Sequence, residues 1–226
     1  MLSPIPHRVL TAILLLATGC SEDLVATDNG DAGPGILPIT TEMYEDGFLT
    51  TVDATDRETW RYFDLESAAE VFPALPEDSS EWDLAFQRFR IQSNGGSSGT
   101  GGAEVSIQRD QTFEGVTAAP IAPYIQDSPD GDDEDADPDL AFLVGDGWYS
   151  YDEGSHILTA RPIIFIVRTP ESRFFKVQVL DYYDGAGTSG HLSFRWAEID
   201  PPSLASQFFV PRLQHAETIT TTSNQS

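Results

Sequence analysis

The sequence is poor in the residues from which most reactive sites are built. Its 226 residues include one cysteine, Cys20, so neither an internal disulfide nor a cysteine-based zinc site is expected. Basic residues are scarce too: 12 Lys and Arg stand against 37 Asp and Glu, and the formal net charge is -25. Because a protein this acidic repels the phosphate backbone, nucleic acid is not expected as a partner.

Motifs of the common enzyme classes are missing as well. The sequence contains no GxSxG, HExxH, CxxC or P-loop motif, and only three histidines follow the N-terminal segment: His156, His191 and His215. A pair of carboxylates could serve a glycosidase, but among 37 acidic residues the sequence singles out no pair. We therefore predict that the protein is not an enzyme.

The glycine-rich stretch SNGGSSGTGG (93–102) lacks the context of a phosphate-binding loop. Such a loop needs a following helix whose N-terminal amides face the anion. Here the strand-like AEVSIQ (103–108) follows, and no lysine stands after the glycines. We expect a loop that uses glycine for positive φ angles or for close backbone packing.

The stretch DSPDGDDEDADPD (127–139) carries eight carboxylates in thirteen residues. Carboxylate oxygens could bind calcium, but the ligand spacing of an EF-hand is absent. Because like charges repel one another and keep a chain extended in water, a solvated acidic loop is the favoured interpretation.

The N-terminus has the pattern of a bacterial secretion signal. After a short basic start, the apolar run Val9–Ala17 is shorter than the roughly 20 residues of a membrane-spanning helix. The small residues of LATGC then lead to Cys20, in a pattern that resembles the lipobox of bacterial lipoproteins. We predict a signal peptide at 1–19, lipidation of Cys20 and a flexible tether over 20–43, where the chain is polar, acidic and rich in Gly and Pro.

From Phe48 onward, short apolar runs alternate with Gly, Pro, Asp and Ser, a pattern typical of an all-β protein. We predict a single antiparallel β domain over residues 44–200 and a partly disordered C-terminal extension over 201–226. Three late segments joined by short turns are predicted to form a C-terminal β-meander: PIIFIVRT (162–169), RFFKVQVLDYY (173–183) and HLSFRWAEI (191–199).

The apolar patterns also predict how these strands are covered. Ile163–Val167 is apolar without a break, as expected of a strand buried on both faces, whereas Leu192, Phe194 and Trp196 alternate with polar residues on a half-exposed strand. Earlier strands are predicted at 58–65, at 81–92 with a bulge near Gln87 and Arg88, and at 103–108 as the return partner of 81–92, with a helical turn at 66–71.

Taken in order, these segments resemble the signatures of HmuY-family lipoproteins. The similarity is carried by TVDATDRETWRYFDL (51–65), WDLAFQRFRIQSNGGSSGTGGAEV (82–105), GWYSYDEGSHILTARPIIFIVRTPESRFFKVQVLDYY (147–183) and HLSFRW (191–196). The resemblance implies an all-β, HmuY-like domain anchored by lipid to the outer membrane, at the cell surface or, alternatively, on the periplasmic face. It further implies a haemophore for iron acquisition, which passes haem to a TonB-dependent receptor.

The iron ligands that the resemblance implies do not match residue by residue. The family's haemophores use one histidine from the loop before the GW segment and one just after its tryptophan. Here the loop 109–146 contains no histidine, and the run YDE (151–153) stands a few residues after Trp148, with His156 three positions later. A methionine pair, used by other members, is excluded because only Met43 follows the signal segment.

The candidate ligand-binding residues follow from these departures. If haem is bound, we predict His156 as its iron ligand, with the Tyr151 phenolate as second choice. Arg88 could pair with haem propionates, because a guanidinium matches a carboxylate with two hydrogen bonds, or form an ordinary cross-strand salt bridge. Trp148 could border the ligand or lie in the core. The competing hypothesis is an HmuY-like scaffold that binds another apolar ligand or a protein partner.

Overall fold

The computed structural model describes residues 38–131 and 138–203, and within them almost every regular element is a strand. This confirms the predicted all-β class. In chain order the elements are β1 (Ile39–Tyr44), β2 (Gly47–Asp53), β3 (Arg61–Asp64), β4 (Ala69–Val71), the 3-10 helix η1 (Pro76–Asp78), β5 (Leu84–Gln87), β6 (Arg90–Ser93), β7 (Glu104–Gln108), β8 (Tyr149–Asp152), β9 (Ile157–Ala160), β10 (Ile164–Arg168), β11 (Phe174–Tyr183) and β12 (Ser189–Glu198).

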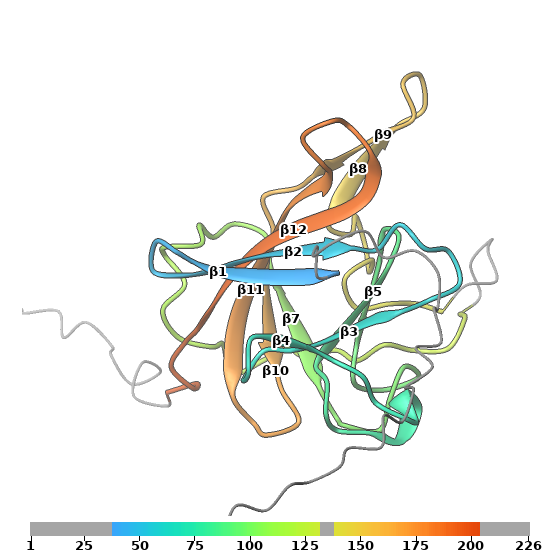
Figure 1. Ribbon diagram of the computed structural model, residues 1–226. Coiled ribbons are helices and arrows are strands. Elements are labelled where there is room, and N and C mark those ends of the chain that lie inside the picture. Colours follow the sequence, from blue (N-terminus) through green and yellow to red (C-terminus); the bar gives the residue numbers. More distant parts are fainter. Residues whose placement is uncertain (1–37, 132–137, 204–226) are drawn as a thin grey trace, which may run out of the picture. The chain divides into compact units, whose positions relative to one another are not determined.

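The strands form three antiparallel sheets (Figure 1). The large sheet has the strand order β1-β2-β12-β11-β10-β7, and the small sheet has the order β4-β3-β5-β6. Among the strands that the structure describes, β8 and β9 pair only with each other and form a separate ribbon. Among the described residues, no helix has the length and apolar character needed to cross a membrane.

The predicted C-terminal meander is confirmed, because β10, β11 and β12 are successive neighbours in the large sheet. The run from Ile163 to Val167 is buried throughout, as its unbroken apolar sequence indicates. In β12, Leu192, Phe194 and Trp196 are buried while the residues between them are partly exposed. The last strand is therefore half exposed, as predicted.

The main core lies between the large and small sheets and is dominated by aromatic rings. Phe194 of β12 stacks on Phe86 of β5, with ring centroids 5.3 Å apart. Phe63 of β3 meets both Phe194 and Trp196 edge-on, at 5.8 and 5.9 Å. All four rings are at most 2% exposed. Offset-stacked and edge-on ring pairs contribute about 0.5–1.5 kcal/mol each beyond their buried area, so this cluster holds the two sheets together.

A second, smaller apolar cluster covers the opposite face of the large sheet. It includes Phe113 from the connection between β7 and β8. The only lysine of the chain, Lys176 of β11, is buried here: its Nζ donates to the backbone carbonyls of Phe113 and Val116 at 2.8 and 3.0 Å. The Phe113 ring also contacts the Arg195 guanidinium, at 4.2 Å. Two cations thus hold this connection on the sheet.

The region predicted as one strand with a bulge, 81–92, is instead a hairpin. Gln87 of β5 pairs with Arg90 of β6, so Arg88 and Phe89 form a two-residue turn in which Arg88 has a φ of 53°. The predicted return partner is also wrong, because β7 pairs with β10 of the large sheet. The glycine-rich loop 93–102 carries the chain from one sheet to the other.

Two further differences lie near the start of the fold. The helical turn predicted at 66–71 is wrong: the Asp64 carboxylate accepts the backbone N–H groups of Glu66 and Ser67, and the turn leads into β4. Strand β1 pairs with β2 along its length and begins at Ile39, inside the range predicted as tether. Cys20, His215 and the acidic residues 132–137 lie outside the described residues.

The glycine-rich loop uses both properties for which glycine was expected. Gly96 and Gly102 have positive φ angles, and a Cβ on Gly96 would lie only 1.8 Å from the Asp127 carbonyl oxygen. The loop folds around the buried Asn94, whose amide donates to the carbonyls of Ser79 and Trp82 at 2.8 and 2.7 Å. It is a compact structural loop packed against residue 127.

Candidate functional site

A pocket of about 750 Å³ opens beside the β5–β6 turn, within the usual range of small-molecule sites of roughly 300–1,000 Å³. Phe89 of that turn and Tyr149 of β8 supply two aromatic rings to its wall. The segment 138–147 supplies the aliphatic side chains Leu140, Leu143 and Val144. Apolar side chains from segments far apart in the sequence thus form one part of a lining that also contains charged and polar groups.

Backbone geometry explains how the pocket wall forms. The N–H groups of Leu143 and Val144 both donate to the Leu140 carbonyl, at 2.8 and 3.1 Å, so the chain turns tightly there. Gly145 and Gly147 follow with positive φ angles of 68° and 62°, a conformation that glycine adopts without strain. The turn presents Leu143 and Val144 toward the β5–β6 hairpin.

Polar groups also line the same pocket. Arg90 is the only cation among its described lining residues, and Asp139 and Asp146 are its acids. The Tyr149 ring contacts Phe89 edge-on at 5.8 Å, and burial raises the pKa of the Tyr149 phenol. At neutral pH the phenol is therefore protonated and can donate a hydrogen bond. None of the described residues that line the pocket is His, Met or Cys.

Trp148 and Arg88 are not among the residues that line the pocket, and their hydrogen bonds hold the β5–β6 turn beside it. Trp148 is fully buried, and its indole N–H donates to the Phe89 carbonyl at 3.0 Å. Arg88 donates to the Thr55 carbonyl at 3.1 Å and to the Ser189 hydroxyl at 2.8 Å. Of the roles left open by the sequence, the structure favours the core role for Trp148. Arg88 forms no salt bridge with a described residue and instead ties the hairpin to β12.

Tyr151 and His156 lie together on the β8–β9 ribbon, outside the pocket. The Tyr151 hydroxyl is hydrogen-bonded to Nδ1 of His156. Tyr151 is 50% exposed, and His156 sits at the ribbon's turn with a φ of 58°. The sequence predicts these residues as alternative iron ligands, whereas the structure places them in contact with each other. The pocket residues Phe89, Leu143 and Tyr149 were missed, although Tyr149 shares a strand face with Tyr151.

The acidic stretch 127–139 is not solvated at its beginning. Asp127 is 2% exposed and accepts hydrogen bonds from the Ser93 N–H at 2.9 Å, the Ser93 hydroxyl at 3.1 Å and the Ala141 N–H at 2.8 Å. Burial raises the pKa of the Asp127 carboxyl, and these donors oppose the shift. Asp127 thus fixes the end of β6 to the segment that enters the pocket wall.

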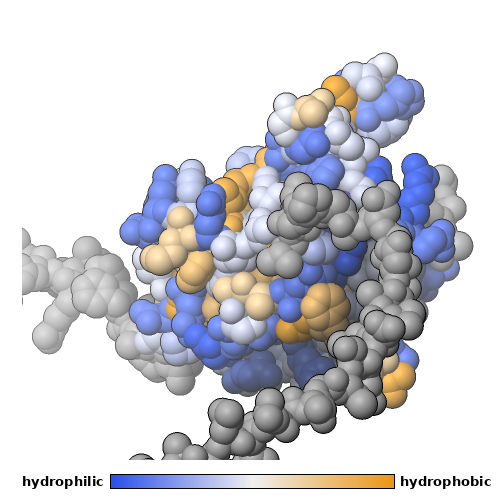
Figure 2. All heavy atoms as spheres, in the orientation of Figure 1, coloured by the Kyte–Doolittle hydropathy of each residue, from blue (hydrophilic) through white to orange (hydrophobic). Residues whose placement is uncertain are grey.

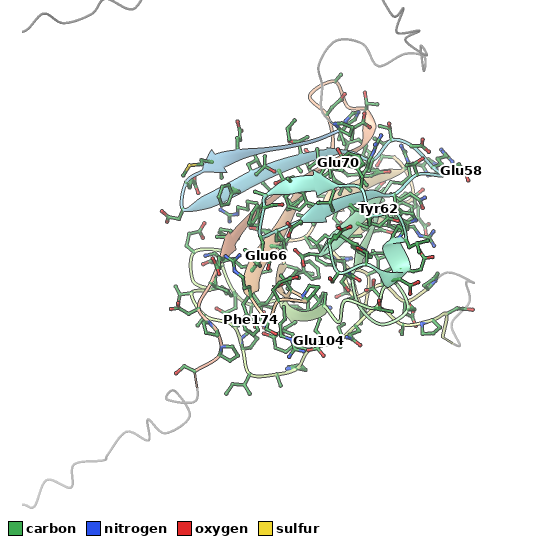
Figure 3. The ribbon with its side chains drawn as sticks, turned by 60° about the horizontal axis from the view of Figure 1, so that its bottom comes forward. Glu58, Tyr62, Glu66, Glu70, Glu104 and Phe174 are labelled. Carbon is green, nitrogen blue, oxygen red and sulfur yellow. The ribbon has the colours of Figure 1, made fainter. Side chains whose placement is uncertain are left out.

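A group of three carboxylates lies on the small sheet, away from the pocket. One oxygen from each of Asp64, Glu66 and Asp83 falls within 4.8 Å of the others. Glu66 directly follows β3, and Figure 3 labels it together with Tyr62 of β3 and Glu70 of β4. The Asp83 carboxylate accepts the Leu65 N–H at 2.8 Å, and Glu66 accepts the Thr169 hydroxyl at 2.7 Å.

The chemistry of this carboxylate group favours a shared proton over a metal ion. Asp83 is 1% exposed; burial raises its pKa to about 9, and the neighbouring Glu66 charge adds to the shift. Burial raises the pKa of Glu66 as well. A proton held between the buried Asp83 carboxyl and the half-buried Glu66 carboxyl removes their repulsion without a cation.

We expect Asp83→Asn to flatten the pH dependence of folding stability. The folded state keeps a proton that the unfolded chain releases above pH ~4, so the free energy of unfolding falls as pH rises from ~4 to ~9. An amide cannot ionise, so the variant loses less stability across this window. Chemical denaturation at pH 5 and pH 8 measures the difference, with the exposed Glu81→Gln as control. An unchanged slope in Asp83→Asn would show that Asp83 does not hold the proton.

Comparison with known proteins gives one family match. The profile of the family described as HmuY protein matches residues 56–196, and no curated protein shows a significant match. Similar solved structures include a predicted lipoprotein from Bacteroides fragilis (18% identity, TM-score 0.52, covering 69% of this chain and 91% of that one) and apo PinO from Porphyromonas gingivitis (16%, 0.51, 66% and 95%). A predicted HmuY-like haem-binding protein from Bacteroides vulgatus gives 15%, 0.46, 67% and 91%. At these identities the two higher scores indicate a common fold.

Proposed function

The chain belongs to the HmuY family, and from this premise we propose that it binds haem in the pocket between Phe89 and Tyr149 and passes it to a TonB-dependent receptor. The pocket is the observation that carries the proposal. Its volume suits a small organic ligand, and its aromatic and aliphatic wall suits a flat apolar macrocycle. It lies beside the segment after Trp148, where the resemblance implies that the ligand binds.

The described pocket lining carries one cation and two acids, and these charges act on the two carboxylates of haem. Arg90 presents a guanidinium, which can form paired hydrogen bonds with a propionate. Asp139 and Asp146, the acids among the described lining residues, would repel the propionates. The charges thus favour one orientation, with the propionates toward Arg90. In this role haem is the cargo of a binding protein, and no catalytic role is proposed.

We expect haemin added to the purified chain to give a sharpened and shifted Soret band. Val144→Asp should weaken this binding about tenfold, because it places a charge on the apolar pocket wall at a side chain that is already 40% exposed. Ile157→Asp, on the ribbon and 48% exposed, is the matched control and should bind like wild type. Wild-type protein that never perturbs the haemin spectrum would remove the haem proposal.

The location proposed for the protein is the outer membrane, with attachment through lipid on Cys20 and display at the cell surface. Support comes from the LATGC pattern in the sequence. We expect intact-mass analysis of membrane-extracted protein to give a chain that begins at Cys20 and carries lipid. A soluble form that retains residues before Cys20, or a chain with an unmodified thiol, would contradict this prediction. Cys20→Ser should release the protein from the membrane fraction.

A scaffold for another apolar ligand is the second candidate function. It is favoured by the lack of His, Met and Cys among the described pocket residues. A protein partner is less favoured on the face drawn in Figure 2, where hydrophobic residues form separate small patches among hydrophilic ones. Protein-binding sites more often show one extended apolar patch. A ligand that binds with haemin-like affinity but is not a tetrapyrrole would support this candidate.

A further inference from the structure

The donor atoms around the pocket are unsuited to holding iron. Haem iron in proteins is ligated by histidine, methionine, cysteine thiolate or tyrosine. The described lining residues include none of the first three, and the whole connecting stretch 109–146 contains none of them in sequence. Among the described lining residues, Tyr149 is therefore the only one of a known ligand type, and its ring packs against Phe89 and Trp148 at centroid distances of 5.8 and 4.8 Å.

The residues that could ligate iron lie elsewhere and are engaged with each other. Tyr151 and His156 share a hydrogen bond at the end of the ribbon, where both are exposed, and neither lines the pocket. To ligate iron, Tyr151 would have to give up this contact, whereas His156 keeps its Nε2 and is separated from a ligand in the pocket by its position outside the lining.

The side chains that line the pocket suit the organic part of haem. Phe89, Leu140, Leu143 and Val144 can contact the faces and edges of a flat macrocycle, and Arg90 can contact a carboxylate at its edge. All of these interactions are the same whether or not a metal occupies the centre of the ring.

We infer that the pocket recognises the porphyrin ring and its carboxylates and not the iron. Metal-free porphyrin therefore binds with an affinity similar to that of haem. The inference rests on the proposed function, since it assigns a ligand class to the same pocket. It places the selectivity of the site in the shape and charge of the macrocycle.

The test compares haemin and metal-free protoporphyrin IX on the full chain, by quenching of tryptophan fluorescence and by absorbance. We expect the two dissociation constants to agree within about threefold, which is less than about 1 kcal/mol. Haemin that binds more than about tenfold tighter would overturn the inference and leave the haem proposal intact. Binding of neither compound would overturn both.

Variants separate the pocket from the ribbon in the same assay. Val144→Asp should weaken both ligands by the same factor, whereas Tyr151→Phe and His156→Ala should change neither. A variant at Tyr151 or His156 that loses haemin but keeps protoporphyrin would contradict the inference and assign iron ligation to the ribbon, as the sequence predicted. The exposure of both side chains makes a general folding failure of these variants unexpected.

Discussion

Replacing Asp127 with alanine is expected to lower the free energy of unfolding by about 3–5 kcal/mol. The substitution removes the only side-chain acceptor that the structure gives to the N–H groups of Ser93 and Ala141, and leaves both donors buried. Buried donors without partners cost roughly 1–3 kcal/mol each. Urea denaturation followed by tryptophan fluorescence measures the loss.

The same substitution should also weaken ligand binding at the pocket. Asp127 holds Ala141, next to Leu140 and Leu143 of the pocket wall, against the end of β6. Asp130→Ala is the matched control, because Asp130 is an exposed acid of the same stretch, and its effect should stay within about 0.5 kcal/mol. Equal effects of the two variants would show that Asp127 acts through charge alone and not through its hydrogen bonds.

Truncation of Trp148 to alanine is expected to cost about 3–5 kcal/mol of stability, as for other large buried aromatic residues. The side chain is fully buried in the main core, and its N–H is the link to the Phe89 carbonyl of the β5–β6 turn. Trp148→Phe should lose less stability, because it keeps most of the apolar volume, although it gives up the hydrogen bond to Phe89. Thermal and chemical denaturation provide the comparison.

A functional readout distinguishes this role from direct ligand contact. If Trp148 supports Phe89 from behind, Trp148→Phe should weaken porphyrin binding only modestly, by about two- to fivefold. Tyr151→Ala, in strand β8 directly after Trp148, is the aromatic control, and loss of its half-exposed side chain should cost less than about 1.5 kcal/mol of stability. Complete loss of binding in a stable Trp148→Phe protein would show that the indole itself contacts the ligand.

The sequence predicts the elements with strong local signals and misses those set by distant contacts. The meander is readable because Ile163–Val167 is apolar without interruption and Leu192, Phe194 and Trp196 alternate. The β5–β6 hairpin is not, because its turn uses Arg88 at positive φ in place of the asparagine or glycine that normally marks such a turn. Strand β7 is predicted correctly as a strand, but its pairing partner is not. It pairs with β10, which lies more than 50 residues later in the sequence.

The candidate site was harder to predict for the same reason. Trp148 attracts attention as a rare large aromatic, and only burial shows that it belongs to the core. Leu143 and Val144 look like ordinary apolar residues until the turn after Leu140 brings them beside Phe89. The position of Tyr149 could be predicted, because strand alternation places it on the face opposite Trp148. Strand β1 could also be predicted, from the β-branched run that begins at Ile39.

The burial of Lys176 decides how the protein can be attached to surfaces and labels. Amine-reactive esters attack an exposed, unprotonated amine, and the single lysine side chain is 8% exposed with its Nζ bonded to two carbonyls. Amine-reactive reagents will therefore not attach to Lys176 while the domain is folded. Carbodiimide coupling, by contrast, acts on the many carboxylates of the chain and would attach the protein in many orientations.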